Sequence, residues 1–187
     1  MNKILQAAKF AETIHKNQKR KYSTNVPYIV HPARVAGRCA LLPYANEDDI
    51  CVGFLHDTVE DTKHNKGVIA DLILSTFGYD VYEGVIALTK YSKFSGEEWA
   101  KDKNRETRWR MDLERLRTEK SRWHNIKILD RIDNLNSFNG ADPAFKKIYL
   151  RESRELLETM RYAHDNSYPD ALLIIELMDL IEKLEKE

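Results

Sequence analysis

Four side chains that can bind a metal ion or move a proton are crowded into the stretch GFLHDTVEDT, at His56, Asp57, Glu60 and Asp61. Apolar residues recur through this stretch at helical spacing, so it predicts a helix with a buried face. On that helix His56 and Glu60 form one pair four residues apart, and Asp57 and Asp61 form a second pair beside it. A solvated helix end explains Glu60 or Asp61 well. It explains His56 and Asp57 inside an apolar run less well, which favours one wall of a cleft.

A second group of polar residues lies in IKILDRIDNL, where Lys127, Asp130 and Asn134 share one helical face. Apolar residues occupy most of the remaining surface, so this helix is expected to be largely buried. A buried carboxylate needs a cationic partner or a metal ion. On periodicity alone, a structural ion pair of Asp130, to which Arg131 can contribute, comes before a metal ligand.

The remaining histidines carry a weaker signal. His31 precedes a proline at an expected helix start, where a lone histidine is usually a cap or a packed ring. The others have no comparable setting and are expected at the surface or in ordinary packing: His15, His64, His124 and His164.

The chain reads as a succession of helices with joints at its few glycines and prolines. No alternating strand pattern is present, so we expect an all-α fold, a single compact multi-helix bundle. The second half of the charged segment 91–125 has helical spacing, and its first half is expected to be a loop. The last helix is amphipathic and either closes the core or forms a face for a homo-oligomer. Outside the segment 91–125, the expected helices lie at 2–18, 31–42, 46–62, 66–78, 80–90, 126–138, 142–164 and, for the last one, 168–187.

The totals of the chain exclude some classes of protein. It has 187 residues, of which 42% are hydrophobic and 32% charged, as in soluble globular domains. Its 30 basic and 30 acidic residues cancel, which argues against a general nucleic-acid binder. The first residues lack the apolar core of a signal peptide, and no apolar run is long enough to span a membrane. Cys39 and Cys51 lie outside any CxxC motif and are expected to be buried free thiols, which suits a cytoplasmic location.

Four motifs taken together resemble one family. RKYSTNVPYIVHP, GFLHDTVEDT, FGYDVYEGVIALTK and KILDRIDNL occur in that order. This series resembles the HD-domain hydrolases of the RelA/SpoT type, which act on the alarmones guanosine tetra- and pentaphosphate. The resemblance covers roughly residues 5–140. It implies one HD-type metal-dependent phosphohydrolase domain over residues 1–187, a stand-alone small alarmone hydrolase.

The resemblance also implies a metal site. It makes His31, His56, Asp57 and Asp130 the four ligands, a mixed set of nitrogen and oxygen donors that leaves positions for water and a phosphate oxygen. The family's usual ion is manganese, although another divalent ion is an alternative. Two further carboxylates, Glu60 and Asp61, match the pair that orients and deprotonates the attacking water in the family.

The implied substrate contacts come from two motifs. Arg20 and Lys21 match residues that hold the nucleotide, with the arginine packed on the guanine ring, and Asn134 and Ser137 match positions that face it. Tyr28 either lines the pocket or packs. Relatives place residues that grip the phosphates distal to the scissile bond in the segment 91–125, although a solvated helical face is the better explanation for most of its cations. The candidates there are Lys101, Lys103, Arg105, Arg108 and Arg110.

The leading interpretation is therefore a manganese-dependent enzyme that removes the 3′-pyrophosphate of (p)ppGpp, giving GDP or GTP and pyrophosphate. Its expected partner is a small nucleotide, with neither a nucleic acid nor a membrane involved. One alternative keeps the fold and changes the substrate to ppApp or to a nucleoside mono- or triphosphate. Another is a non-catalytic nucleotide-binding regulator. The presence of all six ligand and acidic residues argues against it, because a regulator without catalysis need not retain them.

Overall fold

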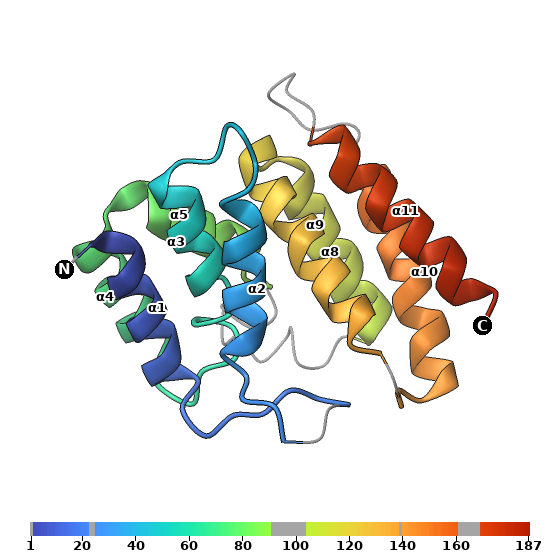
Figure 1. Cartoon of the computed structure of the whole chain (residues 1–187), viewed down its shortest axis with the longest axis horizontal. Helices are drawn as coiled ribbons and strands as arrows, with labels where there is room; N and C mark the ends of the chain where they lie inside the picture. Colours follow the sequence, from blue (N-terminus) through green and yellow to red (C-terminus); the bar gives the residue numbers. More distant parts are fainter. Residues whose placement is uncertain (1, 23–24, 91–103, 139, 161–168) are drawn as a thin grey trace.

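The computed structural model describes residues 2–22, 25–90, 104–138, 140–160 and 169–187 (Figure 1). Within these ranges the regular elements are all helices, accompanied by one isolated bridge between Lys19 and Pro27. The predicted all-α fold class is confirmed. The helices are α1 (Lys3–Ile14), α2 (Val30–Cys39), α3 (Glu47–Leu55), α4 (Lys66–Phe77), α5 (Tyr79–Leu88), α8 (Arg105–Arg117), α9 (Ser121–Asn136), α10 (Pro143–Met160) and α11 (Ala171–Glu185).

Side-chain caps explain where several of these helices begin. The side chain of Asn46 accepts hydrogen bonds from the first turn of α3, and Asp49 closes a capping box with it. The side chains of Asn65 and Asn104 likewise accept a hydrogen bond from the first turns of α4 and α8. Gly78 ends α4 at a φ of +87°, a left-handed backbone conformation that glycine adopts without strain.

Helix α9 lies between the group formed by α1 to α5 and the pair α10 and α11 (Figure 1). It packs against α2, α3, α5, α10 and α11, so nearly every residue from Trp123 to Leu135 is buried. The buried set includes the charged side chains of Lys127, Asp130, Arg131 and Asp133. Charges inside a core need partners or a ligand, which makes α9 the element to examine for function.

Helices α2 and α3 are antiparallel neighbours joined by a short connection, so the start of α2 and the end of α3 lie side by side. Their contact is close because α3 presents a glycine there. A β-carbon on Gly53 would meet the Ala36 Cα at 2.8 Å. This contact brings the first turn of α2, with His31, next to His56 at the end of α3.

The helix boundaries correct the sequence prediction in places. The helix expected at 46–62 ends at Leu55, and residues 56–60 form turns. One reason is local: the Thr58 hydroxyl donates to the Leu55 carbonyl at 2.6 Å and competes with the helical pattern. α9 ends at Asn136, before Gly140.

Helix α8 confirms the helix expected in the second half of 91–125, whereas the loop expected in the first half lies outside the described residues. Of the helices described, none combines the length and hydrophobicity needed to cross a bilayer. Cys39 and Cys51 are free and buried as predicted, and burial raises the pKa of each thiol to about 12.

Candidate active site

Three side chains from different helices converge on one point. The Nε2 atoms of His31 and His56 lie 3.2 Å apart, and Oδ1 of Asp130 lies 3.2 Å from the first and 3.8 Å from the second. All three are buried. Neighbouring donors about 3 Å apart are the arrangement expected around a cation bound at about 2.1 Å. These three residues form a candidate site for a divalent metal ion.

Asp57 lies next to both histidines of this group. Its Oδ2 lies 3.4 Å from Nε2 of His31 and 3.2 Å from Nε2 of His56. The same oxygen accepts a hydrogen bond from the Tyr28 hydroxyl at 2.6 Å. Asp57 is therefore as near to both imidazoles as Asp130 is. The structure brings together all four ligand candidates.

The outer nitrogens of the two imidazoles show which way the rings face. Nδ1 of His31 lies 2.7 Å from Oδ2 of Asp133, and Nδ1 of His56 lies 2.9 Å from the carbonyl oxygen of Gly53. Both partners accept hydrogen bonds, so each imidazole carries a proton on Nδ1. In the neutral rings both Nε2 lone pairs then point at the same place. Two imidazole nitrogens and two carboxylates fit a divalent cation.

The pKa values of the two histidines depend on the carboxylates that lie close to them. Burial by itself lowers the pKa of the His31 imidazole, but hydrogen bonds to Asp130, Asp133 and Asp57 outweigh it and raise this pKa to about 11. Burial also opposes the charged form of His56, whose pKa is nevertheless raised by Asp57 and Asp130. A cation that binds here must therefore displace a proton.

The two carboxylates shift in the opposite direction. Burial raises their pKa values, but the nearby cations dominate, Lys127 for Asp130 and the two histidines for Asp57. Both pKa values lie well below the ordinary range. The carboxylates therefore remain charged, as ligands of a cation must be.

The ion pair expected for Asp130 forms with a different residue. Lys127, one turn earlier on α9, donates to Oδ2 of Asp130 at 2.9 Å, and the amide of Asn134 donates to Oδ1 at 2.5 Å. Arg131 lies elsewhere, because its guanidinium packs over the rings of Tyr149 and Trp109 at 4.1 and 5.2 Å from their centroids. Asp130 therefore has the features of both interpretations, since it has a cationic partner and it also faces the candidate metal position.

The two acidic residues after the HD dipeptide have different surroundings. Glu60 is buried, and both of its oxygens are engaged by Lys90, through the ammonium at 2.5 Å and the backbone N–H at 3.2 Å. Burial raises the pKa of Glu60, but the Lys90 charge outweighs it and lowers the pKa below its usual value. Oδ2 of Asp61 lies 3.3 Å from the Tyr28 hydroxyl, which also contacts Asp57. Asp61 is thus the acid linked directly to a ligand candidate.

A groove of about 770 Å³ runs over these residues and continues to the nucleotide-binding candidates. Nη2 of Arg20 donates to the side-chain oxygen of Asn134 at 2.9 Å and lies 3.3 Å from the Ser137 hydroxyl. Lys21 is exposed and lines the same groove. Tyr28 lines it too, with its ring 5.8 Å from the Arg20 guanidinium carbon. The four substrate-contact candidates therefore line the same groove as Asp57 and Asp130.

The cations predicted to grip distal phosphates have unequal positions. Arg105 and Arg108 line the groove, and Arg105 forms two hydrogen bonds with Glu152 at 2.7 and 2.8 Å. Arg110 is 76% exposed and pairs with Glu106 on its own helix, as a solvated helical face predicts. Lys101 and Lys103 lie outside the described residues.

Asp133 and Lys90 belong to the site but were not singled out from the sequence. Asp133 accepts a hydrogen bond from His31, and Lys90 binds Glu60. Asp133 had one signal, since it is a further carboxylate in an otherwise apolar helix. Lys90 is the last residue of the motif FGYDVYEGVIALTK, but no spacing pairs it with Glu60, which it meets only in the folded chain. His15 and His124 were expected either at the surface or in ordinary packing. Both are buried, which agrees with ordinary packing.

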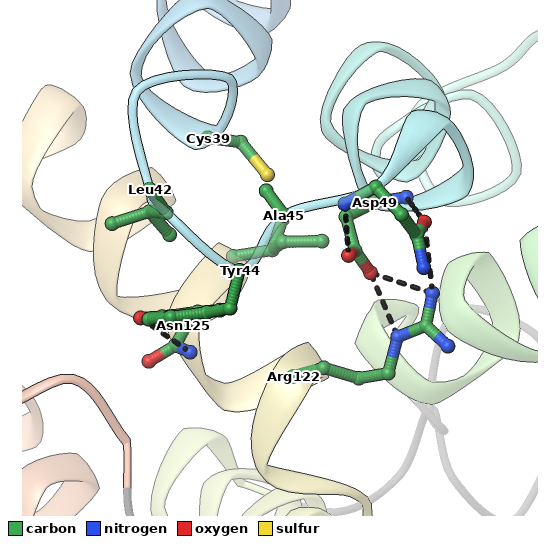
Figure 2. Close-up of a pocket in the computed structure, with 9 residues that line it drawn as sticks. Cys39, Leu42, Tyr44, Ala45, Asp49, Arg122 and Asn125 are labelled. Carbon is green, nitrogen blue, oxygen red and sulfur yellow. Dashed lines mark hydrogen bonds and ion pairs between the residues drawn. The ribbon is translucent and has the colours of Figure 1, made fainter.

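A second cavity, of about 200 Å³, lies where α2 ends and α3 begins, away from the candidate metal site (Figure 2). Its polar side chains satisfy one another. Arg122 binds Asp49 at 2.7 Å, and Asn125 donates to the Tyr44 hydroxyl at 3.2 Å (Figure 2). That hydroxyl donates to Asp170 at 2.9 Å. These bonds tie the connection after α2 to α9 and α11, which indicates a structural role.

Known proteins with similar sequences carry the names of enzymes that act on guanosine nucleotides. The chain is 34% identical over 153 residues to a guanosine-3′,5′-bis(diphosphate) 3′-pyrophosphohydrolase of Aquifex aeolicus, covering 82% of this chain and 20% of that protein. It is 32% identical over 153 residues to a probable enzyme of the same name from Synechocystis, covering 82% and 19%. A GTP pyrophosphokinase of Myxococcus xanthus is 30% identical over 136 residues, covering 73% and 17%. The chain spans about a fifth of the length of these relatives.

Solved structures share the fold. One is a metazoan ortholog of SpoT, described as hydrolysing ppGpp and playing a role in starvation responses, with a TM-score of 0.78 and 22% identity over 98% of this chain and 96% of that one. Another is lmo0812 of Listeria monocytogenes, with a TM-score of 0.65 and 24% identity over 86% and 97%.

The family model described as the HD domain matches residues 7–162, a range that includes all four ligand candidates. The resemblance seen in the sequence motifs agrees with this match. The chain belongs to the HD-domain family.

Proposed function

We propose that this chain is a metal-dependent phosphohydrolase that removes the 3′-pyrophosphate of guanosine tetra- or pentaphosphate. One observation carries the proposal: Nε2 of His31, Nε2 of His56 and Oδ1 of Asp130 meet at one point, and Asp130 lines a groove that Arg20 also lines. The names of the relatives support the substrate. We further propose that residues 1–187 form one domain in the cytoplasm, supported by the packing of α11 on α9 and by the two free cysteines.

His31, His56, Asp57 and Asp130 would hold the ion, and we propose manganese. The carboxylate oxygens favour a hard cation, while the imidazoles suit a transition metal, and manganese accepts both. When bound, the ion supplies Lewis-acid polarisation of a phosphoryl oxygen and lowers the pKa of water.

The reaction forms a bond between a water oxygen and phosphorus and breaks the bond from that phosphorus to the ribose 3′ oxygen. One proton leaves the water, and the 3′ oxygen gains one, so GDP or GTP and pyrophosphate result. Asp61 takes the proton from water, because it lies beside Asp57 through the Tyr28 hydroxyl. Glu60 holds Lys90 at the groove wall, where its ammonium offsets negative charge on the phosphates.

Arg20, Lys21, Asn134 and Ser137 hold the nucleotide. The planar guanidinium of Arg20 can stack on a base, and its bond to Asn134 holds it over the groove. Lys127 and Arg108 also line the groove and supply positive charge for phosphates.

The test is pyrophosphate release from ppGpp by purified protein with added Mn²⁺. Asp57→Asn and Asp130→Asn are expected to lose the activity, whereas Asp71→Asn, which changes an exposed carboxylate on α4, is expected to keep it. Activity that survives both substitutions contradicts the proposal. Turnover of ppApp or GTP in preference to ppGpp supports a different substrate, and tight binding of ppGpp without turnover supports a regulator.

A further inference from the structure

We propose that Asp133 is a positioning residue that holds the His31 imidazole with Nε2 directed at the metal site. The inference rests on the proposed metal-dependent function, since it assigns a partner to one of its ligands. Asp133 follows Asp130 by three residues on α9, so one helix supplies both a ligand and the group that orients another ligand.

The contact between the two residues is short and buried. Nδ1 of His31 lies 2.7 Å from Oδ2 of Asp133, and the side chains are 0% and 9% exposed. An imidazole can present either nitrogen to a cation unless the other nitrogen is held. A carboxylate on Nδ1–H fixes both the tautomer and the ring orientation, and it makes Nε2 a stronger donor.

The two histidines differ in this respect. Nδ1 of His56 donates to the carbonyl oxygen of Gly53, a neutral acceptor on its own chain segment. His31 lies at the start of a helix, and its ring is held by a charged residue from α9. His31 therefore depends on a long-range contact for its orientation, whereas His56 is oriented locally.

Asp133 is itself held in place. Nη2 of Arg20 lies 3.4 Å from the same oxygen that binds His31, and the Ser137 hydroxyl donates to the Asp133 backbone carbonyl at 2.9 Å. Arg34 reaches the other oxygen at 3.6 Å, but its side chain is 58% exposed, so its contribution is small. Arg20 thus joins Asp133 to Asn134, which places this carboxylate between the nucleotide contacts and the metal ligands.

The experiment measures Mn²⁺ affinity by titration calorimetry without any nucleotide. Asp133→Asn keeps the shape and a hydrogen-bond acceptor but removes the charge, and it is expected to weaken Mn²⁺ binding about 10- to 100-fold. Asp133→Glu restores the charge and is expected to recover part of the affinity. Two controls are expected to stay within about twofold: Asp71→Asn, and Arg34→Gln, which changes the exposed neighbour of Asp133.

Unchanged Mn²⁺ affinity in a folded Asp133→Asn protein would overturn the proposal and leave the metal site standing. Absence of Mn²⁺ binding in the natural protein would overturn both. If the variants do not fold, nitrogen NMR of the histidines in the natural protein loaded with Zn²⁺ provides the test, because it shows which imidazole nitrogen binds the metal. A proton on Nδ1 of His31 with metal on Nε2 supports the proposal, and metal on Nδ1 overturns it.

Discussion

Gly53 lies directly against Ala36, so close that a β-carbon on the glycine would meet the Ala36 Cα at 2.8 Å. This contact brings α3 onto the backbone of α2. One turn beyond Gly53, His56 reaches His31, and their Nε2 atoms are 3.2 Å apart. The glycine therefore sets the separation of two candidate ligands without touching a metal itself.

Gly53→Ala is expected to force α2 and α3 apart and to cost about 1–3 kcal/mol of unfolding free energy, with weaker Mn²⁺ binding as a consequence. Gly37→Ala on α2 is the matched control, because a β-carbon there meets nothing within 4 Å. It is expected to leave Mn²⁺ binding unchanged and to stabilise the helix by up to about 1 kcal/mol. Urea unfolding and calorimetry measure the two effects, and equal behaviour of the two variants would contradict the role of the contact.

Metal binding is expected to release protons at neutral pH. The metal-free fold raises the pKa of His31 from its ordinary value to about 11, so its proton stabilises that fold fully below about pH 6.5 and progressively less as the pH rises through about 11. A cation needs the neutral imidazole, so its affinity is expected to rise with pH. Calorimetry near pH 7 in buffers with different heats of ionisation counts the protons released. A heat that is the same in all buffers would show that none is released.

Acid is expected to destabilise the metal-free protein through its buried carboxylates. The folded pKa values of Asp57, Glu60 and Asp130 lie below their ordinary values. Their ionised forms therefore stabilise the fold above about pH 4, and this stability is lost as the pH falls through the folded values. Urea unfolding between about pH 7 and pH 3 measures the loss. Glu60→Gln is expected to make the dependence shallower, and an unchanged curve would contradict the assignment to Glu60.

Asp61→Asn and Glu60→Gln are expected to separate proton transfer from support of the fold. Asp61→Asn removes the proposed base and is expected to lower kcat about 100-fold or more, with little change in the melting temperature. Glu60→Gln leaves Lys90 without its charged partner, so it is expected to lower the melting temperature of the metal-free protein as well. Activity and thermal melting of the same preparations provide the comparison. Full activity of Asp61→Asn would exclude it as the base.

Much of the fold is determined by interactions between residues that are close in the sequence. The caps at Asn46, Asn65 and Asn104 are short polar side chains at helix starts, and Gly78 ends α4 through a backbone conformation that few other residues adopt. Such features act within a few residues, so they are readable along the chain. The position of Lys127, Asp130 and Asn134 on one face of α9 also follows from helical period alone.

Helical period also explains the partner of Asp130. Arg131 is its nearer basic neighbour in the chain, yet Lys127 binds it, because Lys127 lies on the same face of α9 and Arg131 does not. Period fails at the end of α3, where turns replace the helix that spacing predicts through His56 and Glu60.

The all-α class can be read from the spacing of apolar residues, and the motifs identify the residues to examine: His31, His56, Asp57 and Asp130. The pairs Asp133 with His31, Lys90 with Glu60 and Arg20 with Asn134 become visible only in the folded chain. Helical period orders side chains only along one helix, so it cannot predict these pairs. Contacts between helices depend on how closely their backbones pack, as Gly53 and Ala36 show.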